Sequence, residues 1–135
     1  MQSTKKMFLI WMFSTIAFAQ QAVEVSDVII SDLGNNSLEI RVEVKNTSTK
    51  SISELAGSVD IYDKYGNIME KQVIAIVLNS DIPLRPQNTA ASSIIITQRP
   101  NMSGKVNFRI TNLRYFSEPN VYMICPACGE LIPKD

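Results

Sequence analysis

The sequence predicts an all-β protein, an immunoglobulin-like antiparallel β-sandwich of about seven strands. Three observations lead to this fold class. Apolar and polar residues alternate in several short segments, as they do in strands with one buried face. Turn residues separate these segments at intervals of about ten residues. The chain has 135 residues, which leaves room for one hydrophobic core once an N-terminal leader is set aside.

The N-terminus has the pattern of a secretory signal peptide over residues 1–19. Lys5 and Lys6 precede an apolar run at 7–18, and small residues at 17 and 19 suit a signal peptidase. The run is shorter than the ~20 residues of a membrane-spanning helix, which argues against a membrane anchor. We expect the mature protein to begin near Gln20, to be periplasmic or secreted, and to have no transmembrane segment.

The strands follow in order from Val23. The first covers Val23, Val25 and 28–30, and the turn residues 32–36 reverse it. The second, after this turn, is the clearest, because its apolar residues fall on one face and its charged residues on the other. Its inward residues are Leu38, Ile40, Val42 and Val44. A polar loop at 46–51 leads into the third strand.

The segment 55–68 predicts the hairpin around which the sheet is organised. Asp63 is expected to cap the turn backbone, and Gly66 to supply a positive φ. Gly57 lies inside the first strand of the hairpin, where it is expected to mark a β-bulge.

Beyond this hairpin, Ile68–Leu78 is long for one strand. We expect it either to bend from one sheet to the other or to be buried on both faces. Two prolines make 82–88 a connection between the sheets. The remaining predicted strands are 92–98, 105–111 and 121–124, with an irregular segment at 113–119 before the last.

Composition excludes several classes of function. The chain has 13 basic and 13 acidic residues and no histidine. Loss of the leader lysines leaves a slightly acidic protein without a basic cluster, which argues against a nucleic-acid partner. Without histidine there is no Ser-His-Asp triad and no imidazole metal ligand. Asp60, Asp63 and Glu70 flank the hairpin and are expected to be solvated. The sequence therefore predicts a protein that is not an enzyme.

Two stretches resemble the FxLYD domain family. One is 42–48, a valine-rich strand that ends in Asn-Thr. The other is 59–66, where Tyr62 and Asp63 match the family pattern, while valine and isoleucine stand in place of its Phe and Leu. A Pro-Leu pair at 83–84 is similar to the connection that follows the motif. The resemblance, over 38–96, implies an exported bacterial β-sandwich with no assigned catalytic residues.

A predicted sandwich domain at 20–124 is followed by a C-terminal tail at 125–135 with the sequence Cys-Pro-Ala-Cys-Gly. An oxidising compartment favours a disulfide between Cys125 and Cys128, although so short a loop gives it little entropic stabilisation. The spacing also suits one knuckle of a zinc ribbon. Because a tetrahedral site needs four ligands, zinc would be shared between two chains. Thiol–disulfide exchange is the third interpretation.

The leading functional hypothesis is a binding module of the bacterial cell envelope, without a cofactor, that engages a protein partner through a sheet edge or loops. Four aromatic residues are candidates for its binding surface, namely Tyr62, Tyr65, Tyr115 and Phe116. The alternative is a cysteine-dependent role of Cys125 and Cys128, either metal-bridged assembly or thiol–disulfide exchange. The sequence does not determine the oligomeric state.

Overall fold

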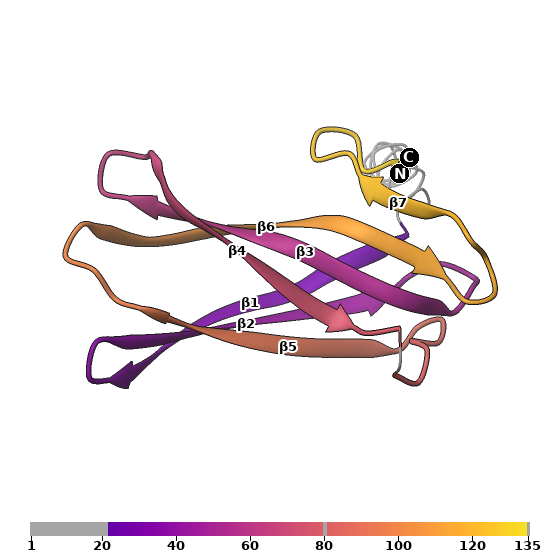
Figure 1. The fold of residues 1–135 in the computed structure, drawn as a ribbon, viewed down its shortest axis with the longest axis horizontal. Coiled ribbons are helices and arrows are strands. Elements are labelled where there is room, and N and C mark those ends of the chain that lie inside the picture. The colour runs from indigo at the N-terminus through magenta and orange to yellow at the C-terminus, as the bar shows by residue number, and fades with distance from the viewer. Residues whose placement is uncertain (1–21, 80, 135) are drawn as a thin grey trace, which may run out of the picture.

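The computed structural model describes residues 22–79 and 81–134, which form two antiparallel β-sheets packed face to face (Figure 1). One sheet has the strand order β1-β2-β5 and the other β4-β3-β6-β7-β8. The strands are β1 (Val23–Gly34), β2 (Ser37–Asn46), β3 (Ile52–Asp63), β4 (Ile68–Val77), β5 (Thr89–Thr97), β6 (Met102–Tyr115), β7 (Val121–Ile124) and β8 (Leu131–Lys134). The predicted all-β sandwich is confirmed, with eight strands where about seven were expected.

The predicted signal peptide lies outside the described residues. Within 22–79 and 81–134 no helix is long and apolar enough to cross a membrane.

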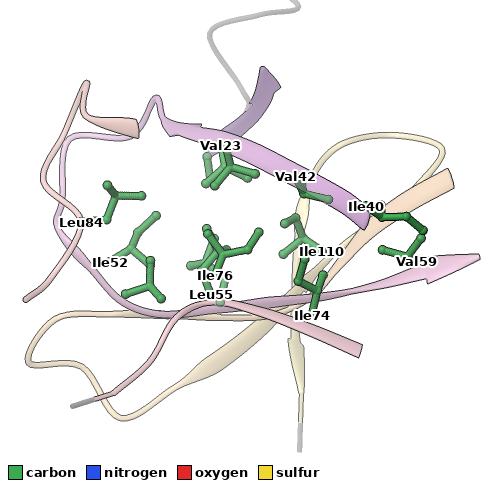
Figure 2. Packing of buried hydrophobic residues seen from close by; sticks show 14 of the residues in the cluster. Val23, Ile40, Val42, Ile52, Leu55, Val59, Ile74, Ile76, Leu84 and Ile110 are labelled. Carbon is green, nitrogen blue, oxygen red and sulfur yellow. The ribbon is translucent and has the colours of Figure 1, made fainter. Parts of the chain in front are cut away.

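The core lies between the two sheets, whose side chains meet in the space between the layers (Figure 2). Ile40, Val42 and Val44 of β2 are fully buried, so the predicted inward face of this strand is confirmed. Val59 and Ile61 of β3, which belongs to the opposite sheet, are also buried. Burial of each such side chain contributes about 1.5–3 kcal/mol relative to exposure.

The two predicted hairpin turns form with the expected residues. Asn35 and Asn36 both have positive φ between β1 and β2, the geometry that a two-residue hairpin requires. At the β3–β4 turn, Asp63 Oδ1 accepts hydrogen bonds from the backbone N–H of Tyr65 (2.8 Å) and of Asn67 (2.9 Å). Gly66 has φ 86°. The predicted roles of Asp63 and Gly66 are therefore confirmed.

Strand β4 differs from both expectations for 68–78. It stays in one sheet as an edge strand beside β3, and it is buried on one face only. Ile74 and Ile76 are buried, whereas Val73 just before them and Leu78 just after the strand are exposed. The apolar run suggested burial on both faces, but each sheet of a two-layer sandwich has one face toward the core and the other toward solvent.

The C-terminal part of the chain also departs from the predicted boundaries. Residues 113–115, expected to be irregular, continue β6, and residues 131–134 form β8. β8 pairs with β7 in an antiparallel hairpin at the edge of the five-stranded sheet. Residues 131–134 of the predicted tail therefore belong to the five-stranded sheet, through their pairing with β7. The connection at 82–88 crosses between the sheets as predicted, and Leu84 forms a β-bridge with Ile52.

One buried side chain joins three segments at the end of β2. Asn46 is fully buried, and its Nδ2 donates to the carbonyls of Lys50 (2.8 Å) and Leu84 (2.9 Å). Its Oδ1 accepts from Ser48 N (2.9 Å) and Ser48 Oγ (2.7 Å). The backbone of Asn46 also exchanges hydrogen bonds with Gln87 and Asn88. Every polar group of the side chain is thus paired, as a buried amide requires.

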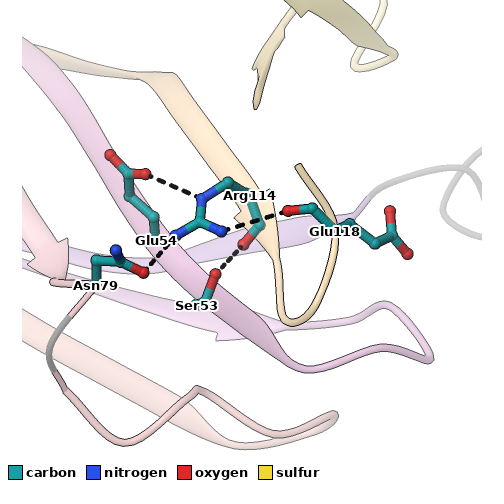
Figure 3. Close-up of polar contacts among 5 residues, drawn as sticks. All are labelled: Ser53, Glu54, Asn79, Arg114 and Glu118. Carbon is teal, nitrogen blue, oxygen red and sulfur yellow. Dashed lines mark hydrogen bonds and ion pairs between the residues drawn. The ribbon is translucent and has the colours of Figure 1, made fainter. Parts of the chain in front are cut away.

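Arg114 of β6 joins three other segments on the surface of the five-stranded sheet (Figure 3). Its Nε lies 3.5 Å from Glu54 Oε1 of β3, and its Nη1 donates to the Glu118 carbonyl at 3.3 Å. Its Nη2 donates to Asn79, just beyond β4. Ser53 Oγ in turn donates to the Arg114 carbonyl at 3.2 Å. Arg114 therefore connects β3 with the segments that follow β4 and β6.

Gly57 lies opposite a register shift and makes a close contact. The pairing of β3 with β6 shifts between Ala56 and Gly57, and the extra residue, Thr111, is in β6 rather than in the strand of Gly57. The ring of Phe108 also lies against this glycine. A Cβ at position 57 would be 2.3 Å from the Arg109 carbonyl oxygen and 2.4 Å from Phe108 Cε1. The position therefore excludes any side chain.

We predict that Asn46→Asp destabilises the protein by at least about 3 kcal/mol at pH 7, because two buried carbonyls lose their donors. The introduced carboxylate also faces those carbonyls, so its pKa rises and the loss is smaller at pH 4.5 than at pH 7. Urea unfolding at both pH values measures this against wild type. The control is Asn101→Asp at an exposed turn, expected within about 0.5 kcal/mol of wild type. Equal losses for the two variants would contradict the proposed role of Asn46.

We predict that Gly57→Ala costs at least about 2 kcal/mol, because the new methyl group overlaps backbone that cannot move freely. Chemical denaturation provides the measurement. Ser58→Ala, at the next position of the same strand, is the matched control and is expected to change stability by about 0.5 kcal/mol at most. A neutral Gly57→Ala variant would show that β3 and β6 can separate locally at little cost.

Candidate binding site

The two sides of the sandwich are closed to different extents. On one side β4 and β5 contact each other. On the other side β1 is the outer strand of its sheet, and β7 pairs with β6 near its C-terminal end, at Leu113 and Tyr122. We call this second side, bounded by β1 and by residues 102–111 of β6, the open side. In the described chain, backbone groups along both strands face this side without a neighbouring strand.

A hollow of about 300 Å³ lies at one end of the open side, and we call it the cysteine-end hollow. β1 contributes Val23 and Val25, of which Val25 is 41% exposed. The opposite wall is formed by 107–110 of β6. The β7–β8 turn closes the end with Ile124, Cys125, Pro126 and Gly129. The cysteine motif therefore lies beside a hollow with both apolar and polar lining residues.

A second, wider hollow of about 770 Å³ lies at the other end of the open side, and we call it the hairpin-end hollow. Val28 and Ile30 of β1 face Val106 of β6 across it. The β3–β4 turn contributes Tyr62 and a polar rim, and the remaining lining residues are Asp63, Lys64, Gly66, Ser103, Gly104 and Lys105. The two hollows together give the open side a lining in which apolar residues alternate with polar ones, a mixture that binding grooves also have.

Strand β1 carries features that protect an edge strand from uncontrolled pairing. A register shift between Val25 and Asp27 interrupts its pairing with β2. Acidic side chains occur along it at Glu24, Asp27 and Asp32. Bulges and charges of this kind are common on edge strands and reduce self-association. The residues of β1 were not recognised as site residues from the sequence, because strand order decides which strand is at an edge.

The four aromatic residues proposed as one binding surface do not lie together. Tyr115 pairs with Ile52 at the start of β3 and is buried, while Phe116 next to it is exposed. Tyr62 lies at the other end of β3, and Tyr65 in the following turn is 82% exposed. The length of β3 separates the two pairs by roughly 30 Å. Of the four, Tyr62 lines the open side.

Asp60 was expected to be solvated and is instead 4% exposed. It faces Arg109 of β6, with 3.4 Å between Arg109 Nε and Asp60 Oδ2 and 3.5 Å between Nη2 and Oδ1. Charged neighbours of opposite sign explain how the carboxylate can be buried here. The carboxylate of Asp60 is thus held in an ion pair, and that of Asp63 accepts the hydrogen bonds of the turn. The two carboxylates therefore do not form an acid–base site.

The cysteine motif forms a tight turn between β7 and β8. Cys125 N donates to the Glu130 carbonyl (2.9 Å) and Gly129 N to the Cys125 carbonyl (2.8 Å). Cys128 N donates to Cys125 Sγ at 3.1 Å. Gly129 has φ 77°, which favours glycine at this position. Both cysteines are free thiols in the structure, with Cys125 half-buried and Cys128 exposed. Their disulfide is not formed here and stays a prediction for the exported protein.

The two thiols have different acidities because they interact with each other. The pKa of Cys125 is lowered, first by a hydrogen bond from the Cys128 side chain and then by backbone N–H donors of the turn. The pKa of Cys128 is raised, because its thiol proton is held by Cys125. The first proton lost by the pair therefore leaves a thiolate at Cys125. In the described residues no three potential metal ligands gather at one place.

Comparison with known proteins gives little further identification. No protein-family model matches the chain, and no curated protein matches it, so the FxLYD resemblance stays a prediction. Among solved structures the chain is similar to IrmA from Escherichia coli, with a TM-score of 0.45 and 12% sequence identity. The match covers 84% of this chain and 82% of that one. A likeness this distant carries no inference about function.

We predict that Cys125 reacts with iodoacetamide at lower pH than Cys128, because thiolate is the reactive species. In Cys128→Ala the pH midpoint for Cys125 should rise, since its main hydrogen-bond donor is removed. Peptide mass spectrometry of the reduced protein across a pH series measures both midpoints. Glu130→Gln is the control and should leave the Cys125 midpoint unchanged. A Cys125 midpoint that is unaffected by Cys128→Ala would contradict the proposed interaction between the thiols.

Proposed function

We propose that the protein is an exported, non-enzymatic binding module of the bacterial cell envelope. On this proposal, an extended segment of a protein partner lies along the open side, between β1 and β6. The observation that carries it is the coincidence of two unpaired strand edges with two hollows that apolar residues partly line. The exported location rests on the leader pattern at 1–19.

The chemistry of the open side suits an extended peptide better than a compact ligand. Edge strands offer regularly spaced N–H and C=O groups to the backbone of an added strand. Alternate side chains of that strand would enter the hollows, where Val25 and Ile30 are 41% and 37% exposed. The hollows lie at opposite ends of the same side, so one strand could use both. Apolar side chains at alternate positions are therefore the expected feature of the partner segment.

The outer face of the three-stranded sheet is the competing surface. Ile29, Leu33 and Ile95 are exposed large apolar residues on or beside that face. It carries charged residues of β2, such as Arg41 beside Ile29. Single exposed apolar residues are common on protein surfaces and indicate no site by themselves. The open side differs because its apolar residues line hollows.

Neighbouring positions of β1 distinguish these two surfaces. Ile30 pairs with buried Ile40 and lines the hairpin-end hollow, whereas Ile29 pairs with Arg41 and faces outward. A photo-crosslinking amino acid placed at position 30 in the exporting cell should give a covalent adduct with a second protein. The same group at position 29 should give little or no such adduct. Adduct masses on denaturing gels and by mass spectrometry provide the measurement, with equal thermal unfolding midpoints as the folding control.

The outcome can reject the proposal in two ways. Adducts from position 29 but not from position 30 would assign binding to the outer face. Absence of adducts from position 30 in cells that export the protein at its native level would mean that no partner occupies the hairpin-end hollow. Ile30→Asp and Ile29→Asp form a second matched pair, and loss of a crosslink made from position 25 is expected in the first variant alone.

A further inference from the structure

We propose that the β7–β8 turn is one half of a tetrahedral thiolate site for a soft divalent cation such as Zn²⁺. The other half is the same turn of a second copy of the chain, so that Cys125 and Cys128 of two molecules bind one ion. The proposed zinc site does not require the proposed partner binding, but Cys125 also lines the cysteine-end hollow.

The shape of the turn supports metal binding. The two cysteines have the C-x₂-C spacing of structural zinc sites, and they lie at the end of a β-hairpin whose strands pair over four positions. The turn is closed by hydrogen bonds from Cys125 N to the Glu130 carbonyl and from Gly129 N to the Cys125 carbonyl. These bonds thus fix the backbone conformation of the turn that carries both cysteines before a ligand arrives, which lowers the cost of binding.

The turn also stabilises sulfur in its charged form. Cys128 N donates to Cys125 Sγ at 3.1 Å, and such bonds to an ionised acceptor are stronger than neutral ones. A thiolate is the form in which cysteine binds a metal. Hydrogen bonds of this kind act as the outer shell that orients ligands around an ion.

The number of ligands requires a second copy. Among residues 22–79 and 81–134 no three His, Cys, Asp or Glu side chains gather as a metal site, and the chain has no histidine. One chain therefore offers two thiolates, while a structural zinc site takes four ligands. A two-fold axis of a tetrahedron exchanges its four vertices in two pairs. Two identical turns related by such an axis supply four sulfurs with the correct symmetry.

The position of the turn allows two copies to approach. Figure 1 shows the loop between β7 and β8 projecting from the layer that contains β6. Cys128 is exposed and Cys125 half-buried, so the ion would lie at the surface of each chain. β8 is the outer strand of its sheet, with no further strand beyond it in the described chain. The second copy can therefore approach from the β8 side without displacing any described strand.

The test uses protein secreted by an exporting host, reduced in metal-free buffer and titrated with Zn²⁺. Native mass spectrometry should show two chains with one zinc ion, and binding should saturate at half an ion per chain. Chelation should return monomers. Co²⁺ in place of Zn²⁺ should give the thiolate charge-transfer and tetrahedral ligand-field bands of an all-sulfur site. The thermal unfolding midpoint of the metal-free protein should equal that of the monomer recovered after chelation.

Three variants make the result specific. Cys128→Ser should lose zinc affinity by more than the roughly 10- to 100-fold expected for loss of an outer-shell partner, and should stay monomeric. Cys125→Ser should behave in the same way. Glu130→Gln is the control for a carboxylate ligand beside the turn and should retain both the zinc and the dimer. All three should show the circular dichroism of the wild-type sandwich.

Several results would overturn the proposal. They are saturation at one ion per monomer, a zinc-loaded dimer that survives Cys128→Ser, loss of zinc in Glu130→Gln, or no binding by fully reduced protein at micromolar Zn²⁺. A secreted protein whose Cys125–Cys128 disulfide resists reduction would do so as well. Failure here leaves the crosslinking experiment at Ile30 unaffected, because Cys128 lines neither hollow and the Cys128→Ser variant should still crosslink from position 30.

Discussion

The buried amide of Asn46 is the interaction on which one whole end of the sandwich depends. Its side chain bonds the loop at 47–50 and Leu84 of the connection, and the backbone of the same residue bonds Gln87 and Asn88. Because all of its donors and acceptors are used, it can be buried without an unpaired polar group. The connection that it fixes also brings Leu84 to Ile52, so the start of β3 is set by the same residue. The Asn-Thr pair of the FxLYD resemblance thus has a physical role in this chain.

The open side follows from how the chain connects the two sheets. The connection after β4 passes from the five-stranded sheet to β5 of the other sheet and closes one side. No described segment does this between β1 and β6, because β7 returns beside the last part of β6 and then turns into β8. The strands along the gap keep apolar residues on their inner faces, and these become the walls of the two hollows. The groove is therefore a property of the topology rather than of a special sequence motif.

Local patterns in the sequence predict local structure well here. The inward face of β2 and the turn roles of Asp63 and Gly66 follow from period-two alternation and from turn chemistry, which act within a few residues. Structural features that depend on tertiary neighbours were not predicted. An apolar run at 73–78 looks the same at an edge as in a core, and β8 is four residues with a proline that pair because β7 is beside them. Asp60 is buried because Arg109, 49 residues later, faces it. The walls of the open side could not be predicted, since they depend on strand order.

The Cys125–Cys128 turn is the point where the two proposals meet in space. It closes the cysteine-end hollow and also carries the thiols. A two-fold axis through an ion at this turn would place two open sides in equivalent positions around it, each with its hollow adjacent to the axis. Two such grooves on one dimer would bind a partner with paired segments more tightly than one groove, because the second segment binds at high effective concentration. Oxidation of the thiols would remove the metal ligands and leave each groove to act alone, so the redox state of one turn would set the valency of binding.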